Sequence, residues 1–414
     1  YRTALRWLTA SGEEWAPEGV AALQRKISHT YLSGEGDQDE GLAWLAAAME
    51  TLAGVDTPAA RVEQARVYSD WGWVYMQRGQ WDTAEEWLQA ALNLVRNSQH
   101  WEEIASIYNR RSWLAFSRGE WAVAASYAQQ SLALREKLGD MQGMAGSYAN
   151  IGMLMELQGY WNEAAEYYLQ ALEMYRRTGD ARGQAVAHLN AGVIFTHKGN
   201  LDQAKEHLER GLEIAQRLNS PSLIVKAHKN LANLSLWRKE WQEVLAHTEA
   251  TIPLAETVKS AEDLADILSL SGEAYLGLKE WQKATERGRR ALLTAEQLGP
   301  KAMARGRALR LLGATSLRQG DMKAAAEHLN EAVALFRTLD NRFELGRTYV
   351  EVARMEHAGK NDAAALDLLL RAWDIFRALG ARLAMDLVDA ELKVLSNPSR
   401  SPQAGRLESA SART

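Results

Sequence analysis

The chain has 414 residues, of which 47% are apolar and 24% are charged, and its formal net charge is −5. This mild acidity argues against direct nucleic-acid binding, which leaves a strongly basic footprint, and the lack of cysteine excludes disulfides and thiolate metal sites. No apolar run approaches the roughly 20 residues that span a bilayer, so we expect a cytoplasmic protein that does not engage a membrane.

The first residues have the composition of a helix that is already under way. Residues 1–10, "YRTALRWLTA", are typical of the end of a helix, so we predict that residues 1–17 are the end of a preceding helix and a linker. The sequence is therefore predicted to be part of a longer polypeptide. Residues 18–52 are predicted to form a degenerate helical hairpin, with "SGEGDQDEG" (33–41) as its loop.

From about residue 59 one pattern recurs along the chain. "GQWDTAEEWLQAAL" begins at Gly79, and similar segments begin at Gly119, Gly159, Gly199, Lys239, Lys279 and Gly320, spaced by forty residues and by forty-one at the last step. Only seven prolines interrupt a sequence rich in good helix formers. One helical hairpin cannot bury its apolar face alone, so neighbouring hairpins are predicted to stack into a continuous all-α solenoid.

A tryptophan opens the second helix of most repeats. We predict that these side chains wedge between neighbouring helices, and that truncating one costs about 3–5 kcal/mol, as for a core residue. The row consists of Trp81, Trp121, Trp161, Trp241 and Trp281.

The C-terminal part is less regular. Residues 341–379 are predicted to form a last helix pair, in which Asn361 and Asp362 stand where tryptophan is expected. Residues 381–396 are predicted to form a capping helix. The tail 397–414, rich in Ser, Pro and Arg, is predicted to be disordered.

The repeat resembles the tetratricopeptide repeat, whose first helix carries a small residue and an aromatic and whose second helix is marked by alanines. In residues 59–98 the matching positions are Gly72, Tyr75, Ala84 and Ala91. The closing proline of that family is absent, and Gly-Asp turns end the repeats at 139–140 and 179–180. The resemblance covers residues 18–380 and implies a right-handed superhelix whose first helices line a concave groove. The long period is similar to that of the sensor domains of bacterial signal-transduction ATPases (STAND) and related transcriptional activators.

Three asparagines recur at one position of the repeat, two residues before a small residue. They are Asn150, Asn190 and Asn230. Because a helix turns about 100° per residue, each is expected to face the groove rather than the partner helix. An asparagine amide donates and accepts at once, and family members use such a ladder to hold extended peptides. The alternative is a side chain that caps a neighbouring turn or is solvated.

Further groove-facing side chains are candidate anchors for a ligand. An aromatic set could supply binding energy or could be buried by the superhelix, and it comprises Trp73, Trp113, Phe116 and Trp237. A basic set would suit an acidic peptide or a carboxylate, or could be a solvated face, and it comprises Lys226, Lys229, Arg307, Arg310, Arg347 and Arg354. Arg110 and Asn233 complete the predicted groove.

Motifs of catalysis are absent from the sequence. There is no phosphate loop, no H-E-x-x-H and no G-x-S-x-G, so no enzymatic activity, cofactor or metal site is expected. The histidines follow the repeat: His188 and His228 share one position, and His207, His247 and His328 share another.

The sequence therefore favours a non-catalytic module that binds a protein or a peptide segment. We predict the ligand-sensing or autoinhibitory domain of a larger bacterial signal-transduction regulator, with its peptide supplied by another protein or by the same chain. A small-molecule inducer is an alternative ligand. The alternative functions are a free-standing scaffold that bridges two proteins and a substrate-selecting arm of a fused enzyme.

Overall fold

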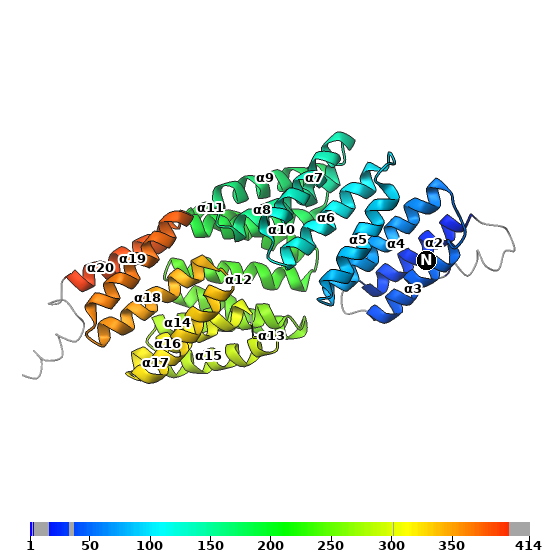
Figure 1. Cartoon of the computed structure of the whole chain (residues 1–414). Coiled ribbons are helices and arrows are strands. Elements are labelled where there is room, and N and C mark those ends of the chain that lie inside the picture. The colour runs from blue at the N-terminus through cyan, green and yellow to red at the C-terminus, as the bar shows by residue number, and fades with distance from the viewer. Residues whose placement is uncertain (2, 4–15, 33–36, 301, 397–414) are drawn as a thin grey trace, which may run out of the picture. The chain divides into compact units, whose positions relative to one another are not determined.

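The computed structural model describes residues 1, 3, 16–32, 37–300 and 302–396 (Figure 1). The predictions for the preceding helix, for part of the loop 33–41 and for the tail 397–414 fall outside these residues. Within them the chain forms nineteen helices and no strand. In chain order the helices are α2 (Pro17–Leu32), α3 (Gln38–Thr51), α4 (Pro58–Gln77), α5 (Trp81–Val95), α6 (Trp101–Ser117), α7 (Trp121–Leu138), α8 (Met141–Leu157), α9 (Trp161–Thr178), α10 (Ala181–Lys198), α11 (Leu201–Arg217), α12 (Pro221–Trp237), α13 (Trp241–Thr257), α14 (Ala261–Gly277), α15 (Trp281–Glu296), α16 (Met303–Gln319), α17 (Met322–Thr338), α18 (Arg342–Ala358), α19 (Asp362–Leu379) and α20 (Arg382–Ser396).

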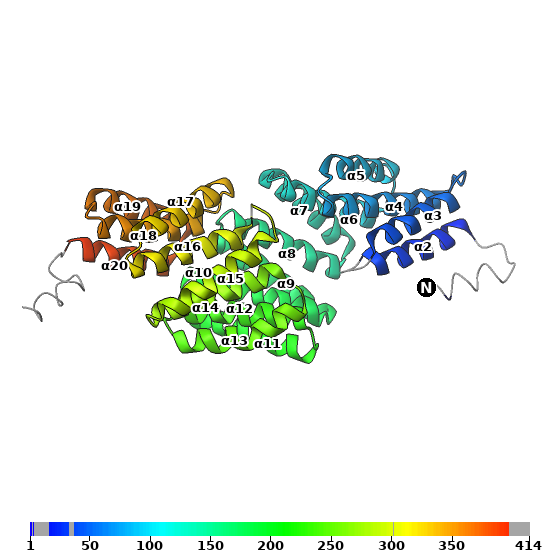
Figure 2. The same cartoon turned by 90° about the horizontal axis from the view of Figure 1, so that it is seen from below.

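Consecutive helices pack as hairpins, with the even-numbered helix first (Figures 1 and 2), in the pairs α2–α3, α4–α5, α6–α7, α10–α11, α12–α13, α14–α15, α16–α17 and α18–α19. The predicted all-α solenoid of stacked helix pairs is thereby confirmed. Small residues set the distance between the two helices of a hairpin. A Cβ atom on Gly72 of α4 would lie 2.7 Å from Leu88 Cγ of α5, and one on Gly192 of α10 would lie 2.6 Å from Leu208 Cγ of α11. A larger residue at either position would push the hairpin apart.

The Gly-Asp turns between repeats have the geometry that their sequence predicts. Gly139 ends α7 in the left-handed region at φ +66°, a conformation that glycine adopts without strain. Asp140 then accepts a hydrogen bond from the Gly143 N–H at 2.9 Å. Asp180 caps α10 in the same way through the Gly183 N–H, so each turn ends one helix and starts the next.

The tryptophan row is less uniform than predicted. Trp161 is only 5% exposed, and Trp241 packs on Gly277, where a Cβ atom would lie 2.7 Å from the indole ring. The wedge is therefore confirmed at these two positions. At Trp81 the prediction is wrong, because that side chain is 42% exposed.

Contacts divide the chain into two compact units. The first unit comprises Tyr1–Leu154 and Glu173–Thr178, and the second unit comprises Met155–Leu172 and Gly179–Thr414. Each unit is described by itself. The described residues contain no helix that is both long enough and apolar enough to cross a bilayer.

Helices from the beginning and the end of the second unit contact each other. The Trp161 ring at the start of α9 lies 4.9 Å from the His197 ring and 5.4 Å from the Phe343 ring, between centroids, and the latter two rings lie 4.9 Å apart. Gly199, after α10, lies beside Leu383 of α20. We call Trp161, His197 and Phe343 the closing cluster, since they join α9 and α10, at the beginning of this unit, to α18 near its end and so make one closed turn of superhelix.

Candidate ligand-binding pocket

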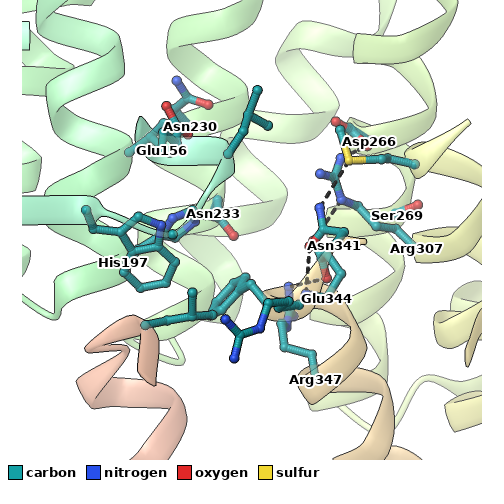
Figure 3. Close-up of a pocket in the computed structure, with 18 of the residues that line it drawn as sticks. Glu156, His197, Asn230, Asn233, Asp266, Ser269, Arg307, Asn341, Glu344 and Arg347 are labelled. Carbon is teal, nitrogen blue, oxygen red and sulfur yellow. Dashed lines mark hydrogen bonds and ion pairs between the residues drawn. The ribbon is translucent and has the colours of Figure 1, made fainter. Parts of the chain in front are cut away.

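A pocket of about 290 Å³ lies inside the closed turn of the second unit. Its wall comes from the end of α8, from the first helices α10, α12, α14, α16 and α18, and from Leu379 at the end of α19. Figure 3 shows polar side chains facing one another across it. Glu156, His197, Asn230 and Asn233 lie on one side, and Asp266, Ser269, Arg307 and Asn341 lie on the other.

Six of the predicted groove residues come together in this wall, namely Lys229, Asn230, Asn233, Arg307, Arg310 and Arg347. Four others belong to the second unit but do not line the pocket, namely Asn190, Lys226, Trp237 and Arg354. Trp237 contacts a residue of the wall, since the Arg347 guanidinium lies 5.4 Å from its ring centroid. The closed turn therefore gathers the predicted residues of α12, α16 and α18.

The remaining predicted residues belong to the first unit. Trp113 packs edge-on against Phe116 at 5.5 Å between ring centroids, and Asn150 donates from Nδ2 to Asn109 Oδ1 at 2.7 Å. Arg110 pairs with the buried Asp70 of α4 at 2.5 Å, and Trp73 lies partly buried on α4.

The first unit has a pocket of its own around Asp70. This pocket measures about 460 Å³ and is lined by residues of α2, α4 and α6. Arg25, His29 and Arg110 all bind the Asp70 carboxylate, and they hold its pKa well below the usual range although burial opposes this. The ion pairs of Asp70 therefore join α2, α4 and α6.

Arginines of α16 hold the wall of the second unit's pocket together. Arg307 Nη1 lies 2.6 Å from Asp266 Oδ1 of α14, and Arg307 Nε lies 2.9 Å from Glu344 Oε1 of α18. Arg310 Nη2 lies 3.2 Å from Glu273 Oε1 of α14, and Arg310 also pairs with Glu344. Both arginines therefore bridge the first helices of the preceding and the following hairpin.

Lys229 of α12 and Arg347 of α18 extend this arrangement. Lys229 Nζ lies 2.6 Å from Asp263 Oδ1 and 3.6 Å from Asp266 Oδ2. Arg347 Nη2 lies 2.9 Å from Glu273 Oε2. We call these eight side chains the ion-pair network: Lys229, Asp263, Asp266, Glu273, Arg307, Arg310, Glu344 and Arg347.

Burial and opposite charge act against each other in this network. Burial alone would raise the pKa of the Glu344 carboxyl, but Arg310, Arg347 and Arg307 outweigh it and hold that pKa well below 4.5. Burial would likewise lower the pKa of the Lys229 amine, and Asp266 and Asp263 raise it instead. Glu344 and Lys229 are therefore both charged at neutral pH.

The network revises the interpretation of the basic set as a free cationic surface. Lys229, Arg307, Arg310 and Arg347 are neutralised by carboxylates of the same unit, and Arg354 pairs with Glu351 and with Glu391 of α20. The main role of these cations is therefore to bind carboxylates of other repeats. Lys226 is exposed and outside the wall.

Polar groups without a partner also occur at the pocket. Within the described part of the chain, the side chains of Asn230 and Asn233 make no hydrogen bond, although both line the cavity one turn apart on α12. Gln158 Nε2 and His197 Nδ1 are buried in the same wall without a hydrogen-bond partner among the described residues. An unsatisfied buried polar atom costs about 1–3 kcal/mol, so the wall is built with unused hydrogen-bonding capacity.

Two titratable groups of the wall have displaced pKa values. Burial lowers the pKa of His197 to about 4, against the opposing charge of Glu344, so its imidazole is neutral at pH 7. Burial raises the pKa of Glu156 to about 7, although the Tyr168 hydroxyl donates to it at 2.7 Å and partly offsets the effect. Glu156 therefore changes charge near neutral pH.

We expect Glu156→Gln to stabilise the second unit in a pH-dependent manner. The ordinary pKa of 4.5 is raised in the folded chain, so the wild type loses stability as the pH rises from 4.5 to about 7, while glutamine has no proton to lose. The free energy of opening should be higher in the variant by about 1–3 kcal/mol at pH 8 and nearly equal at pH 4.5. Native-state hydrogen exchange of α8 and α9 would measure it. Glu166→Gln, at an exposed position of α9, should give no such difference, and a pH-independent effect of Glu156→Gln would contradict the assignment.

The histidines form ring pairs within hairpins. His188 and His207 approach at 3.2 Å between Nδ1 atoms, and His228 and His247 approach at 3.1 Å. Elsewhere the same two positions of the repeat hold stacked aromatic rings, as in Tyr108–Tyr127. The two histidine positions of the sequence thus face each other, a pairing that the repeat alignment alone did not reveal. In the described residues no group of three or more side chains is arranged to bind a metal ion.

Sequence reasoning missed the part of the wall that comes from helix ends. Glu156 lies at the end of α8 and Gln158 just after it, while Asn341 caps α18 and Arg342 and Phe343 begin it. Nothing in the period of the repeat indicates that these distant segments meet. The network carboxylates did leave a signal, because Asp266 and Glu344 lie about one repeat before and after Arg307 in the sequence.

The stacked helix pairs define a class of protein, the α-helical repeat proteins that form a superhelix. Residues 71–257 match the family described as the MalT-like TPR region, and residues 263–338 match a tetratricopeptide repeat family. The chain is a tetratricopeptide-repeat protein, as its sequence pattern indicated. A search of curated proteins gave no match.

Solved structures share the fold at low sequence identity. A Rap protein in complex with competence and sporulation factor is 13% identical, with a TM-score of 0.65 over 88% of this chain and 99% of that one. The apo quorum sensor NprR from B. thuringiensis is 17% identical, with a TM-score of 0.62 over 87% and 99%. A STAND protein with a tetratricopeptide repeat sensor from Pyrococcus horikoshii is 17% identical, with a TM-score of 0.58 over 82% of this chain and 50% of that one.

Proposed function

We propose that this chain is a ligand-sensing tetratricopeptide-repeat domain of a larger bacterial signal-transduction regulator, and that it acts without catalysis by binding a peptide segment in the pocket of the second unit. The observation that carries the proposal is the pair of free amides, Asn230 and Asn233, in the wall of that pocket. Each amide can donate to a carbonyl and accept from an N–H group, which matches the backbone of an extended peptide.

The fold of the related proteins supports a sensing role. The Rap structure holds competence and sporulation factor, and NprR is a quorum sensor. The STAND protein joins such an array to further domains, since this chain covers only half of it. A sensor domain of this kind belongs to the cytoplasm, where a peptide or a segment of the full-length protein would reach the pocket.

The closing cluster supports a way to transmit binding. Trp161, His197 and Phe343 join the two ends of the turn beside the pocket, so a ligand that binds the wall more tightly in the closed turn than in an open one would favour the closed turn. A ligand shifts such an equilibrium only by its different affinity for the two states. A scaffold that bridges two proteins, and an arm of a fused enzyme, have no need of an enclosed pocket with unused hydrogen-bonding groups.

Selection from a random peptide library displayed on phage would test the proposal. We expect the wild-type chain to enrich peptides that compete with one another for one site. The double variant Asn230→Ala/Asn233→Ala should keep its helical circular dichroism and its thermal midpoint, and it should bind the selected peptides at least about tenfold more weakly, a loss of about 1.4 kcal/mol.

A matched variant controls for the loss of an amide as such. Asn330→Ala changes an exposed asparagine of α17 outside the pocket and should bind the peptides as the wild type does. Enriched peptides that are indifferent to the double substitution, or a folded wild-type chain that enriches none, would contradict peptide sensing in this pocket. Simultaneous binding of two proteins by the chain, with no peptide selected, would favour the scaffold.

A further inference from the structure

The balance of charge in the pocket wall depends on the ion-pair network. Its four cations face its four carboxylates at close range, so the network as a whole has no net charge. A ligand that took one of these arginines for itself would leave a carboxylate unpaired in a largely buried place, which costs several kcal/mol. The network is therefore a poor source of cations for a ligand.

One further cation lines the same pocket. Arg342 is the first residue of α18 and follows the cap residue Asn341. Its side chain has no ion pair or hydrogen bond within the described part of the chain, and it is exposed. Among the described residues of the wall, Arg342 is thus the cation that a ligand can bind without breaking an existing pair.

Arg342 lies in the pocket beside a packed part of the wall and in the same pocket as two free amides. Phe343, next in the chain, belongs to the closing cluster, so the guanidinium is attached to a fixed part of the wall. The free amides of Asn230 and Asn233 belong to the same pocket. A guanidinium binds a carboxylate through two parallel N–H donors and thereby fixes its orientation.

We infer that the pocket selects peptides that carry a carboxylate, and that Arg342 binds this carboxylate as the specificity-determining residue. The inference rests on the proposed function, because it names the chemistry of the same ligand. The carboxylate has two possible sources, the C-terminus of the peptide or an aspartate or glutamate side chain.

A double-mutant cycle between chain and peptide tests the inference. The probes are the library peptides selected on the wild-type chain, each synthesised as the free acid, as the C-terminal amide, and with its acidic side chains changed to asparagine or glutamine. On the wild type, one of the two neutralised forms should bind about fivefold more weakly than the parent peptide, as for an ion pair near the surface. On Arg342→Gln the parent should be weakened to the same extent, and neutralising it should have no further effect.

The two neutralised forms distinguish the source of the carboxylate. Loss on amidation assigns it to the C-terminus, and loss on changing the side chain assigns it to an acidic residue. Arg289→Gln, an exposed arginine of α15 outside the pocket, should behave as the wild type does. Peptides that bind equally well in all three forms, or a loss on neutralisation that persists in Arg342→Gln, would overturn the inference while leaving peptide sensing intact. A wild-type chain that selects no peptide would overturn both.

Discussion

Replacing Glu344 by glutamine is expected to destabilise the second unit by about 3–5 kcal/mol, the usual cost of removing one partner from a buried ion pair. Glu344 is buried and pairs with Arg307 and Arg310, and its Oε2 lies 3.7 Å from Arg347 Nη1. Glutamine keeps the size of the side chain but leaves three guanidinium groups facing only two carboxylates, Asp266 and Glu273. Urea denaturation followed by tryptophan fluorescence would measure the loss.

The dependence on pH gives the same prediction an independent check. The pKa of Glu344 is lowered well below 4.5 in the folded chain, so its contribution to stability is fully present above pH 4.5 and declines as the pH falls toward the folded pKa. The difference between wild type and Glu344→Gln should therefore shrink on acidification. Glu327→Gln is the control. The Glu327 side chain is 66% exposed and its ion pair with Lys323 is long, at 4.0 Å, so this substitution should leave the stability nearly unchanged. Equal effects of the two substitutions would show that the network does not stabilise the unit.

Replacing Trp161 by alanine is expected to lower the free energy of unfolding by about 3–5 kcal/mol, as for a core residue. Its ring packs against both His197 and Phe343, so the substitution removes buried apolar area and also opens the contact between the first and last hairpins. Thermal unfolding should shift to lower temperature. Hydrogen exchange should accelerate in α18 as well as in α9, although the two helices are far apart in the sequence.

The matched substitution is Trp81→Ala, at the same position of an earlier repeat. Trp81 is 42% exposed, so its truncation should cost at most about 1 kcal/mol, as for a surface change. If both variants lose the same stability, the closing cluster has no special role. If Trp161→Ala accelerates exchange only in α9, the two ends of the turn are not coupled through it.

Much of this fold could be predicted from sequence because the repeat records local geometry directly. The position of Gly72 indicates where two helices approach, and Gly139 with Asp140 indicates where one helix ends and the next begins. Seven segments in phase repeat this information along the chain. The helix pairs follow from it without any knowledge of distant contacts.

The pocket could be predicted only in part, for a physical reason. The phase of the repeat identifies the inner face of each first helix, which is why Lys229, Asn230 and Arg307 were placed in the groove. The curvature of the array is a sum of small rotations between hairpins, and no single residue specifies it. Whether Trp161 meets Phe343 therefore depends on that sum. Whether carboxylates neutralise the arginines also depends on side-chain rotamers, and these side chains belong to different repeats.

The closed turn also limits how this protein can vary in length. In an open solenoid each repeat contacts only its neighbours, so repeats can be gained or lost at little cost. In the second unit Trp161 and Gly199 require Phe343 and Leu383 as their counterparts. Inserting or deleting one repeat of forty residues between them would move these partners out of reach and disrupt the pocket. The number of hairpins between α9 and α18 is thus fixed by geometry, as the number of blades is in a propeller.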